Sequence, residues 1–330
     1  MLTPLPGTRI NQARPGNQDQ LSPVPNLLTP EFINQEVVKY IDYYRGHGFK
    51  DEDELLAFIE LCWEPVIPGL RIPRNPVCPD HTPPAQFIVD AFFNRYPNCV
   101  VWANRSGGKT FDGALLTWLD AVFKPGCETK ILGGSGEQSQ RMYEHILNLA
   151  TDEFNHLIEG ELLKTRGRLT NKSTIQILTA SSRSVRGPHP QKLKLDEVDE
   201  FDNKIFEAAL LTPKTAGNIK ASTHIYSTMH KPYGLMRRVI TEAAERGYRI
   251  YKWCVFDVME KCVGRDCQTC ELWEDCGGKA KKADGYFPIE DAISLKRQVS
   301  EETWQSEMLC QLPNQEGLIY REFDVALHVI

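Results

Sequence analysis

The sequence predicts an α/β protein with a mostly parallel sheet covered by helices on both faces, preceded by a small helical N-terminal piece. From residue 99 onward, short apolar runs of strand length alternate with segments of helical periodicity. This alternation is typical of parallel strands joined by crossover helices, which bury both faces of the sheet. Two polar motifs, at 103–110 and 196–197, each follow an apolar strand and place chemistry at strand ends.

The predicted elements follow one another without an internal repeat. The N-terminal piece begins with Thr29 as a candidate N-cap and Pro30 at the first helical position. It comprises helices at 28–49 and 51–64, a proline-rich connector at 65–84 and a helix at 85–96. Strands are predicted at 99–103, 129–135, 192–197, 224–230 and 249–257, with a hairpin at 167–180 that turns near Asn171 and Lys172. The intervening helices are predicted at 110–123, 137–150, 203–211 and 234–247.

Length and composition are those of an ordinary soluble globular protein: the chain has 330 residues, 41% of them hydrophobic and 25% charged. The sequence contains no window of eighteen apolar residues, so no membrane span is predicted. Residues 1–26 lack the charged start and apolar core of a signal peptide. That stretch is rich in Pro, Asn and Gln, which predicts a loose arm. The net charge of −6 argues against a protein that coats nucleic acid by bulk charge.

Basic residues nevertheless gather locally, and such a patch could follow a phosphate backbone. Solvated loops are the alternative explanation for each cluster. The clusters are Lys164, Arg166 and Arg168; Arg183 and Arg186; Lys231, Arg237 and Arg238; and Lys279, Lys281 and Lys282.

The stretch VVWANRSGGKT at 100–110 is close to a phosphate-binding loop, whose pattern is Gly, four residues, Gly, Lys and then Ser or Thr. Ala103 stands where the first Gly is usual, which is acceptable if the position needs no positive φ. In such a loop Lys109 reaches the β- and γ-phosphates and Thr110 ligates Mg²⁺. The backbone N–H groups that would face the β-phosphate are those of Ser106, Gly107, Gly108 and Lys109.

A second motif, KLKLDEVDEF at 192–201, runs a predicted strand into two acids. Asp196 at the strand end would hold Mg²⁺ through water, and Glu197 would polarise the attacking water. An exposed turn with two acids is the alternative, but the phosphate loop upstream on the same sheet favours the catalytic interpretation. Together the two motifs predict an ATP hydrolase with ATP and Mg²⁺ as its ligands.

Four of the ten cysteines lie in CVGRDCQTCELWEDC, which indicates a metal site in a reducing compartment rather than disulfides. Four thiolates at this spacing match a structural zinc site, and an iron–sulfur cluster is the rival because four thiolates hold either. Zinc is favoured because nothing indicates redox chemistry; free thiols are the other alternative. The ligands would be Cys262, Cys267, Cys270 and Cys276. In CPDH, by contrast, Cys78 and His81 have no obvious partners and are interpreted as structural.

The segments ANRSGGKT, SVRGPHPQKLKLDEVDEF and IYSTMHKPYG, in this order, resemble the ATPase domain of the large terminase subunit of tailed bacteriophages. These proteins are the motors that pump DNA into the procapsid. The resemblance covers about residues 80 to 320 and implies a P-loop NTPase fold of the ASCE type. It also implies double-stranded DNA as a partner, contacted through its backbone without sequence readout. Further implied partners are a portal protein, a small terminase subunit and neighbouring subunits of a homo-oligomeric ring, in the host cytoplasm and without a membrane.

The same resemblance implies roles for arginines outside the two main motifs. Arg105, embedded in the loop, resembles the family's cis arginine, which contacts the nucleotide phosphates. Arg186, with Arg183 as second choice, resembles an arginine finger supplied in trans by a neighbouring subunit. A surface position would explain Arg105 without a catalytic role, and a structural salt bridge explains Arg183 or Arg186 equally well.

Three further residues match the family's motifs. Ser227 and Thr228, in STMH, resemble the coupling motif that lies beside the γ-phosphate and reports its loss. Ordinary polar residues at a strand end are the alternative. Gln86, in PPAQF, resembles the glutamine that recognises adenine, since a side-chain amide can both donate to and accept from the adenine edge.

The family pattern also predicts the domain organisation. Residues 1–80 would form the arm and helical piece, and 81–316 the ATPase domain with a Cys-rich metal-binding insertion at about 258–283. Residues 317–330 would begin a linker. In the full-length family a ribonuclease-H-like nuclease follows, so this chain is predicted to be the ATPase portion of a longer protein, without nuclease activity of its own.

Two other classes of function remain open. A helicase or remodelling DNA-dependent ATPase would need a second similar domain to sandwich the nucleotide, and it should unwind a tailed duplex. A non-enzymatic DNA-binding or scaffold protein would tolerate a degenerate loop and should not hydrolyse ATP. The intact pairs at 109–110 and 196–197 count against the scaffold.

Lys109→Ala is expected to abolish nucleotide binding or turnover, because it removes the cation that reaches the β- and γ-phosphates. Binding of a fluorescent ATP analogue and release of phosphate measure the two steps separately. A Lys109→Ala protein that still turns over ATP would contradict the phosphate-loop interpretation.

Overall fold

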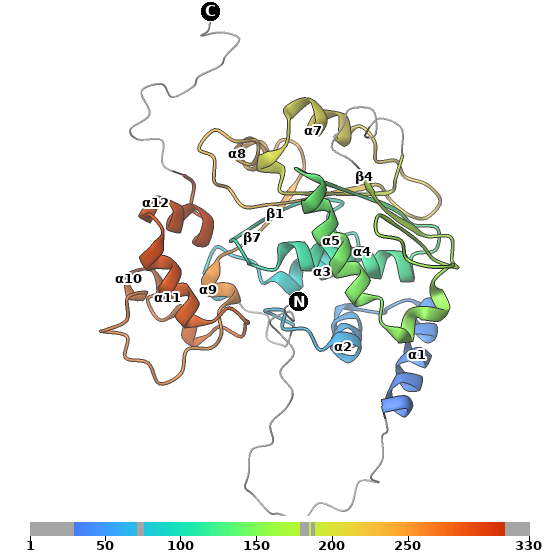
Figure 1. Ribbon diagram of the computed structural model, residues 1–330, viewed down its shortest axis with the longest axis horizontal. Helices are drawn as coiled ribbons and strands as arrows, with labels where there is room; N and C mark the ends of the chain where they lie inside the picture. The colour runs from blue at the N-terminus through green and yellow to red at the C-terminus, as the bar shows by residue number, and fades with distance from the viewer. Residues whose placement is uncertain (1–29, 71–75, 179–184, 186–188, 314–330) are drawn as a thin grey trace, which may run out of the picture.

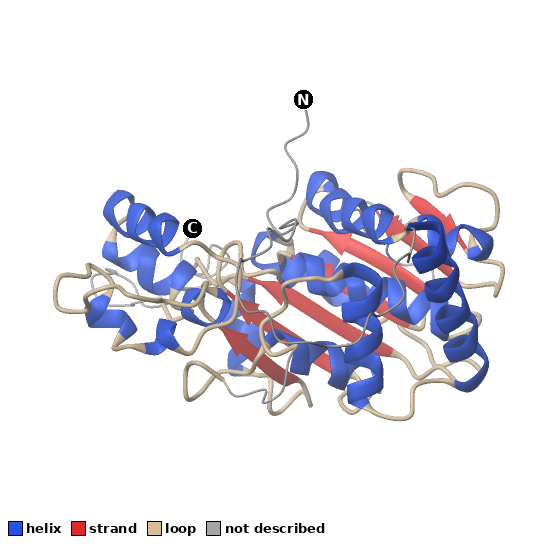
Figure 2. Ribbon diagram, turned by 90° about the horizontal axis from the view of Figure 1, so that it is seen from below, coloured by secondary structure: helices blue, strands red, loops and turns tan. Residues whose placement is uncertain are grey.

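The structure is a computed structural model that describes residues 30–70, 76–178, 185 and 189–313. A seven-stranded sheet runs through its middle with helices on both faces (Figure 1), which confirms the predicted α/β class. Figure 2 shows the strands side by side in one twisted sheet. Within the described ranges, no helix is long and apolar enough to cross a membrane.

The strand order is β3-β4-β2-β5-β6-β1-β7, and every neighbouring pair is parallel except β3 and β4. Strand β6 therefore lies between β1 and β5. These three central strands are buried almost throughout, as expected for a parallel sheet covered on both faces. The strands are β1 (Asn98–Ala103), β2 (Glu128–Gly133), β3 (Arg166–Arg168), β4 (Thr174–Leu178), β5 (Lys192–Asp196), β6 (Ser222–Ser227) and β7 (Arg249–Trp253).

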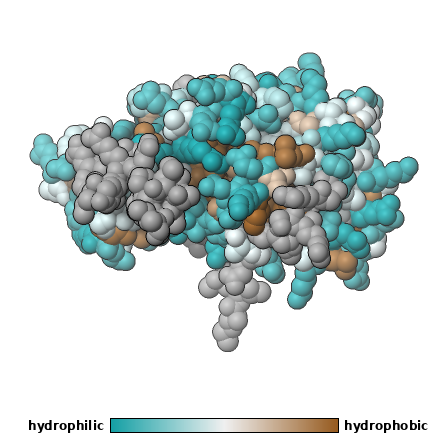
Figure 3. Space-filling model, turned by 90° about the horizontal axis from the view of Figure 1, so that it is seen from above, coloured by the Kyte–Doolittle hydropathy of each residue, from teal (hydrophilic) through white to brown (hydrophobic). Residues whose placement is uncertain are grey.

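Helix α4 contacts both α3 and α5, and the three cover one face of the sheet, whereas α7 and α8 lie on the opposite side in Figure 1. The molecular face on the α7 and α8 side is largely hydrophilic (Figure 3). Helix α4 is buried on nearly all sides, since every residue from Asp112 to Val122 is buried. The helices are α3 (Pro84–Phe92), α4 (Lys109–Phe123), α5 (Gly136–Leu149), η1 (Asp152–Leu157), η2 (Val198–Glu200), α7 (Asn203–Leu210) and α8 (Leu235–Thr241).

The predicted N-terminal helical piece is present as α1 (Pro30–His47) and α2 (Glu52–Trp63). Between these helices, the Phe49 ring lies edge-on to the Phe123 ring of α4, with 4.9 Å between centroids. Aromatic pairs of this geometry add to the burial of their apolar surface. The piece therefore shares its core with the helical layer over the sheet. Thr29, the candidate N-cap, lies outside the described residues.

After β7 the chain forms a group of short helices at one end of the sheet, orange to red in Figure 1. Trp304 is fully buried there, and its Nε1 donates to Asp275 Oδ2 at 3.0 Å. Lys296 pairs with the same carboxylate at 2.5 Å, so one acid holds two elements together. The elements are α9 (Val255–Val258), α10 (Trp273–Cys276), η3 (Lys279–Lys281), α11 (Ile289–Gln298), α12 (Glu301–Thr303) and η4 (Trp304–Met308).

The strand predicted at 249–257 is too long, because it ends at Trp253. The Cys254 backbone N–H donates to the Asp257 carboxylate at 2.8 Å, which caps the short helix α9 and turns the chain out of the sheet. The helix predicted at 234–247 is also too long and ends at Thr241. The predicted hairpin is confirmed, since β3 and β4 are antiparallel.

Candidate nucleotide-binding site

The phosphate loop follows the buried strand β1 and leads into α4, whose N-cap is Gly108. Ala103 is the last residue of β1, is fully buried and is not among the residues with positive φ. The usual first glycine is therefore not required at this position, and alanine fits it. The backbone conformation thus explains why Ala103 can stand where the pattern usually has glycine.

Both loop glycines are required by the backbone. A Cβ atom at Gly107 would lie 2.3 Å from Asn104 Oδ1 and 2.9 Å from the Asn104 carbonyl oxygen. Gly108 has φ of 83°, in the left-handed region of the backbone, which residues other than glycine adopt only at an energetic cost. Ser106 also has positive φ, at 59°. The loop thus keeps a tight turn that only small or absent side chains allow.

Residues from the end of the sheet hold the loop by its backbone. Trp253 Nε1 donates to the Gly107 carbonyl at 2.7 Å, and the Tyr286 hydroxyl donates to the Ser106 carbonyl at 2.9 Å. The sequence alone did not single out Trp253 or Tyr286, because an isolated aromatic residue gives no signal of a partner far away in the chain. These contacts fix the loop from the side of β7 and the C-terminal helices.

Asp196 ends β5 and faces Thr110 of the loop across the sheet edge. The Thr110 hydroxyl donates to Asp196 Oδ2 at 3.2 Å, so the two predicted Mg²⁺ ligands are brought together. Asp196 is 2% exposed, and burial, followed by the charge of Glu197, raises the pKa of its carboxyl to about 7. A buried carboxyl beside a hydroxyl, with a second acid next to it, fits a hard divalent cation such as Mg²⁺.

Glu197 has a left-handed backbone, with φ of 55° and ψ of 54°. Such a conformation is uncommon for a residue other than glycine and is typical of functional sites. Its carboxylate pairs with Lys109 Nζ at 2.9 Å and accepts from the Ser227 hydroxyl at 3.4 Å. The predicted catalytic acid, the loop lysine and the coupling serine therefore form one cluster.

Ser227 and Thr228 are buried at the end of β6, between the loop and the two acids. The Ser227 hydroxyl also accepts from the Asp199 backbone N–H at 3.4 Å. The buried Asp199 carboxylate accepts from the backbone N–H groups of Lys231 and Met236 at 3.1 and 3.0 Å. The sequence analysis did not single out Asp199, although a third acid in DEVDE was a signal. It joins the acidic strand end to the segment before α8.

Arg105 does not reach into the acidic cluster. Its Nε pairs with Glu307 Oε2 at 2.5 Å, and its backbone N–H donates to the Glu307 carbonyl at 2.9 Å. The Arg105 side chain is 66% exposed. A contact with nucleotide phosphates would require the guanidinium to leave Glu307, so this role stays a prediction.

The Gln86 amide is also engaged by the protein. It donates to Asp90 Oδ1 at 2.8 Å on the same helix, α3. Asp90 further accepts from Arg95 and from the Tyr251 hydroxyl, at 2.9 and 2.8 Å. An adenine ring would have to share this amide, and the adenine role of Gln86 stays a prediction. Arg183 and Arg186, the candidate trans arginines, lie outside the described residues.

The four cysteines predicted to bind zinc lie near one another but not at ligand spacing. Together they line one small cavity of about 20 Å³ and are half-buried. In the part of the chain that the structure describes, these thiols form no group whose ligand atoms all lie within 4.8 Å; a different set does. A shared ion would have to draw the thiols together. The zinc or iron–sulfur site at Cys262, Cys267, Cys270 and Cys276 stays a prediction.

A glycine loop between a central parallel strand and a helix, with paired acids ending a strand two positions away, defines the P-loop NTPase class. Among solved structures, the chain is similar in fold to the large terminase of bacteriophage HK97. The TM-score is 0.52 at 16% identity, covering 73% of this chain and 53% of that one.

The chain is also similar in fold to the large terminase of a thermophilic bacteriophage in complex with ATP-gamma-S. The TM-score there is 0.50 at 11% identity, covering 75% of this chain and 56% of the other. The chain therefore spans about half the length of these large terminases, and the resemblance is confirmed at the level of the fold. No family model matches the sequence, and no curated protein matches it.

Asp196→Asn is expected to raise the stability of the nucleotide-free protein at pH 8. The carboxyl binds its proton more tightly in the folded chain, with a pKa of about 7 against 3.8 as its ordinary value. Its ionisation therefore costs up to about 4 kcal/mol of folding free energy above pH 7, and this cost disappears as the pH falls toward 4. Thermal unfolding of both proteins across pH 5–8 measures the difference.

The gain in melting temperature from Asp196→Asn should be largest at pH 8 and shrink toward pH 5. Asp291→Asn, at an exposed position on α11, is the matched control and should show no such trend. A gain independent of pH would contradict the proposed cost of ionising Asp196.

Glu197→Gln is expected to bind ATP about fivefold more tightly while losing hydrolysis. The amide no longer competes for Lys109, and an ion pair of this partial exposure is worth up to about 1 kcal/mol. Equilibrium binding and phosphate release measure both effects. Glu159→Gln, which removes an ion pair with Arg168 at the surface, is the control and should change neither. Weaker ATP binding by Glu197→Gln would show that the ion pair does not compete with the nucleotide.

Proposed function

We propose that this protein hydrolyses ATP at the carboxyl ends of β1, β5 and β6. The observation that carries the proposal is the meeting of the two motifs. Thr110 of the loop lies 3.2 Å from Asp196, and Lys109 lies 2.9 Å from Glu197. A basic group for the phosphates, oxygens for a cation and an acid for water thus lie within one cluster. The fold shared with large terminases supports the same function.

In the proposed reaction, ATP entering the loop draws Lys109 from Glu197 to its own β- and γ-phosphates. The freed Glu197 carboxylate then accepts a hydrogen bond from the attacking water and orients it toward the γ-phosphate. Its left-handed backbone and the Ser227 hydroxyl fix the direction of the carboxylate. Mg²⁺, when bound, neutralises charge on the phosphates, and Thr110 and Asp196 would hold it.

Loss of the γ-phosphate is proposed to be sensed by Ser227. When Glu197 returns to Lys109, the Ser227 hydroxyl follows the carboxylate, and Ser227 also contacts the Asp199 backbone. Asp199 holds the segment leading into α8 through the N–H groups of Lys231 and Met236. The chemical step is thereby connected to an element on the outer side of the sheet.

We further propose that the energy is used to move double-stranded DNA into a viral procapsid. The fold similarity to large terminases and the order of the motifs support this use. The net charge of −6 fits a motor that contacts the DNA backbone through local basic clusters rather than one that coats DNA. The partners in this proposal are a portal protein, a small terminase subunit and further copies of the chain in a ring, in the host cytoplasm.

A ring would add positive charge to the cluster. Arg105 is turned toward Glu307, and Lys109 is the cation that pairs with Glu197 within the described ranges. We propose that Arg186, or Arg183, of a neighbouring copy completes the site and stabilises the transferring phosphoryl group. Hydrolysis would then depend on assembly.

The test is the ATPase rate per subunit over a range of protein concentrations, with Glu197→Gln as the blank. A specific rate that rises with concentration is expected for an arginine supplied in trans. A real rate that stays flat would contradict the trans role and leave a self-sufficient ATPase. No rate above the blank, with and without double-stranded DNA, would contradict the proposed hydrolysis by this chain.

Arg186→Ala is expected to lower the rate by about 10³-fold or more, as for other arginine fingers. Mixing it with Glu197→Gln, which is inactive but keeps Arg186, should restore part of the activity. Arg168→Ala is the matched control, because Arg168 pairs with Glu159 at the surface. An Arg186→Ala defect that the mixture does not relieve would contradict the trans role.

A further inference from the structure

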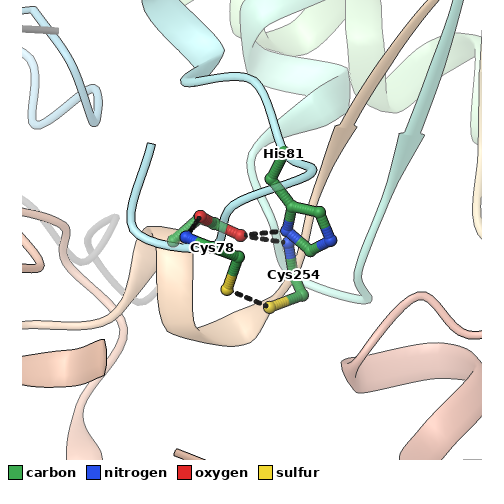
Figure 4. Close-up of side chains that lie close together, drawn as sticks. Cys78, His81 and Cys254 are labelled. Carbon is green, nitrogen blue, oxygen red and sulfur yellow. Dashed lines mark hydrogen bonds and ion pairs between the residues drawn. The ribbon is translucent and has the colours of Figure 1, made fainter. Parts of the chain in front are cut away.

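Four potential metal ligands meet at the edge of the sheet beside the phosphate loop. Cys78 and His81 lie on the connector ahead of α3, and Cys254 and Asp257 follow β7 directly. Their ligand atoms all lie within 4.8 Å of one another. Figure 4 shows the Cys78 and Cys254 sulfur atoms pointing toward each other with the His81 ring beside them. Each pair has two residues between its members, so two short local turns each present two ligands.

The distances inside this group fit a shared ion. Cys78 Sγ and Cys254 Sγ lie 3.6 Å apart, far beyond the ~2.05 Å of a disulfide. Two thiolates bound to zinc at ~2.3 Å in a tetrahedron lie about 3.8 Å apart. His81 Nδ1 lies 2.5 Å from Asp257 Oδ2, and two zinc bonds of ~2.0–2.1 Å would hold these atoms about 3.3 Å apart. Both measured distances therefore lie within about 1 Å of the separations expected in a tetrahedral zinc site.

We propose that Cys78, His81, Cys254 and Asp257 bind one structural zinc ion. The set offers two thiolates, one imidazole and one carboxylate, the three ligand types that zinc takes in proteins. Two soft thiolates disfavour Mg²⁺ and Ca²⁺, which prefer oxygen ligands alone. This site is separate from the cysteine loop at 262–276, and it does not depend on the proposed ATPase function.

Burial makes the site a closed one. Cys78 and Cys254 are 5% and 3% exposed, and the side chains of His81 and Asp257 are 9% and 4% exposed. A catalytic zinc ion keeps an open position for water or substrate, whereas a structural ion has four protein ligands. The same burial argues against a reactive Cys–His–Asp arrangement, because a substrate could not reach the sulfur.

The backbone fixes the carboxylate before any ion arrives. Asp257 Oδ1 accepts from the Cys78 backbone N–H at 3.1 Å, and Oδ2 accepts from the Cys254 backbone N–H at 2.8 Å. Each of these hydrogen bonds joins the Asp257 carboxylate to the main chain of another proposed ligand. Such hydrogen bonds orient the ligands and are part of most metal sites. Preorganisation of this kind favours binding of the ion.

The ion would cross-link two segments far apart in the sequence next to the phosphate loop. Trp253, whose indole donates to the Gly107 carbonyl, directly precedes Cys254. The neighbouring Thr82 N–H donates to the Lys252 carbonyl at 2.7 Å, so the connector already follows the edge strand. Zinc at this point would fix the end of β7 and, through Trp253, the back of the loop.

The test is metal analysis of the full chain purified without chelators, in a Cys267→Ser/Cys270→Ser background that disables the cysteine loop. One equivalent of zinc per chain is expected to remain. Adding Cys254→Ser should remove it. Adding Cys99→Ser, at another fully buried cysteine on β1, should leave it in place. Retention of zinc by the Cys254→Ser protein would overturn the assignment.

A second measurement covers the case in which Cys254→Ser fails to fold. Cobalt added to the metal-free background protein under reducing conditions should give thiolate-to-metal charge-transfer bands and intense visible bands of a tetrahedral site. His81→Cys should keep the ion, because a thiolate replaces the imidazole, and His81→Ala should lose it. Absence of these bands from a folded background protein would overturn the proposal.

A thiol count on the denatured, metal-free protein tests the remaining alternative. All cysteines of the sequence are expected to react as free thiols when the protein is kept reduced during purification but not treated with reductant afterwards. Two missing thiols together with no zinc, and a peptide map that links Cys78 to Cys254, would show that these two cysteines form a disulfide instead. That result would overturn the metal site without affecting the proposed ATP hydrolysis.

Discussion

The parallel hydrogen-bond register of β5, β6 and β1 is the constraint on which the candidate site depends. Asp196 is paired with Tyr226, and Trp102 is paired with Ser227. Because the strands run in the same direction, the residues at their carboxyl ends lie together along one end of the sheet. A slip of one residue in β5 would send Asp196 to the opposite face and separate it from Thr110. The sheet therefore determines the chemistry, although only two of its strands carry the two main motifs.

This arrangement is costly for the nucleotide-free protein. Asp196 is buried, and so is Asp112 in the first turn of α4, where burial raises the pKa of the carboxyl well above its ordinary value. Asp112 Oδ2 has no hydrogen-bond partner among the described residues. Lys194, fully buried on β5, has a pKa lowered to about 8 by burial and lies 3.7 Å from Asp120. Burial thus works against the charged form of each of these side chains, which lowers the stability of the fold.

The fold class, and the residues that meet at the centre of the candidate site, could be predicted from the sequence because both depend on local patterns. Apolar runs, helical periodicity and the glycine loop are each read within about twenty residues. The misplaced ends of β7 and α8 have a local cause, since side-chain capping and turns override periodicity at boundaries. What could not be predicted are partners joined only by folding. The contacts of Arg105 with Glu307 and of His81 with Asp257 span 202 and 176 positions in the sequence.

In each contact that was missed, the sequence drew attention to at most one of the two partners. Cys78 and His81 looked isolated because Cys254 and Asp257 lie in a segment that was expected to continue a strand. Once the strand ends at Trp253, the second pair has the same spacing as the first. Gln86 is the opposite case. A family motif suggested a role in adenine recognition, but in the structure its side-chain amide donates a hydrogen bond to Asp90. A motif gives the type of side chain, and only the packed structure gives its partners.

The ion pair between Lys109 and Glu197 also bears on which anions could enter the phosphate loop. Helix N-termini with free N–H groups commonly bind sulfate or orthophosphate. Here such an ion would have to displace a carboxylate from a lysine whose side chain is only 7% exposed, and it would meet the negative charge of Glu197. A single phosphate offers too few contacts to offset that repulsion, whereas a triphosphate engages the loop, Lys109 and a bound cation together. In the proposed hydrolysis, the same ion pair would hinder the released phosphate from occupying the loop again.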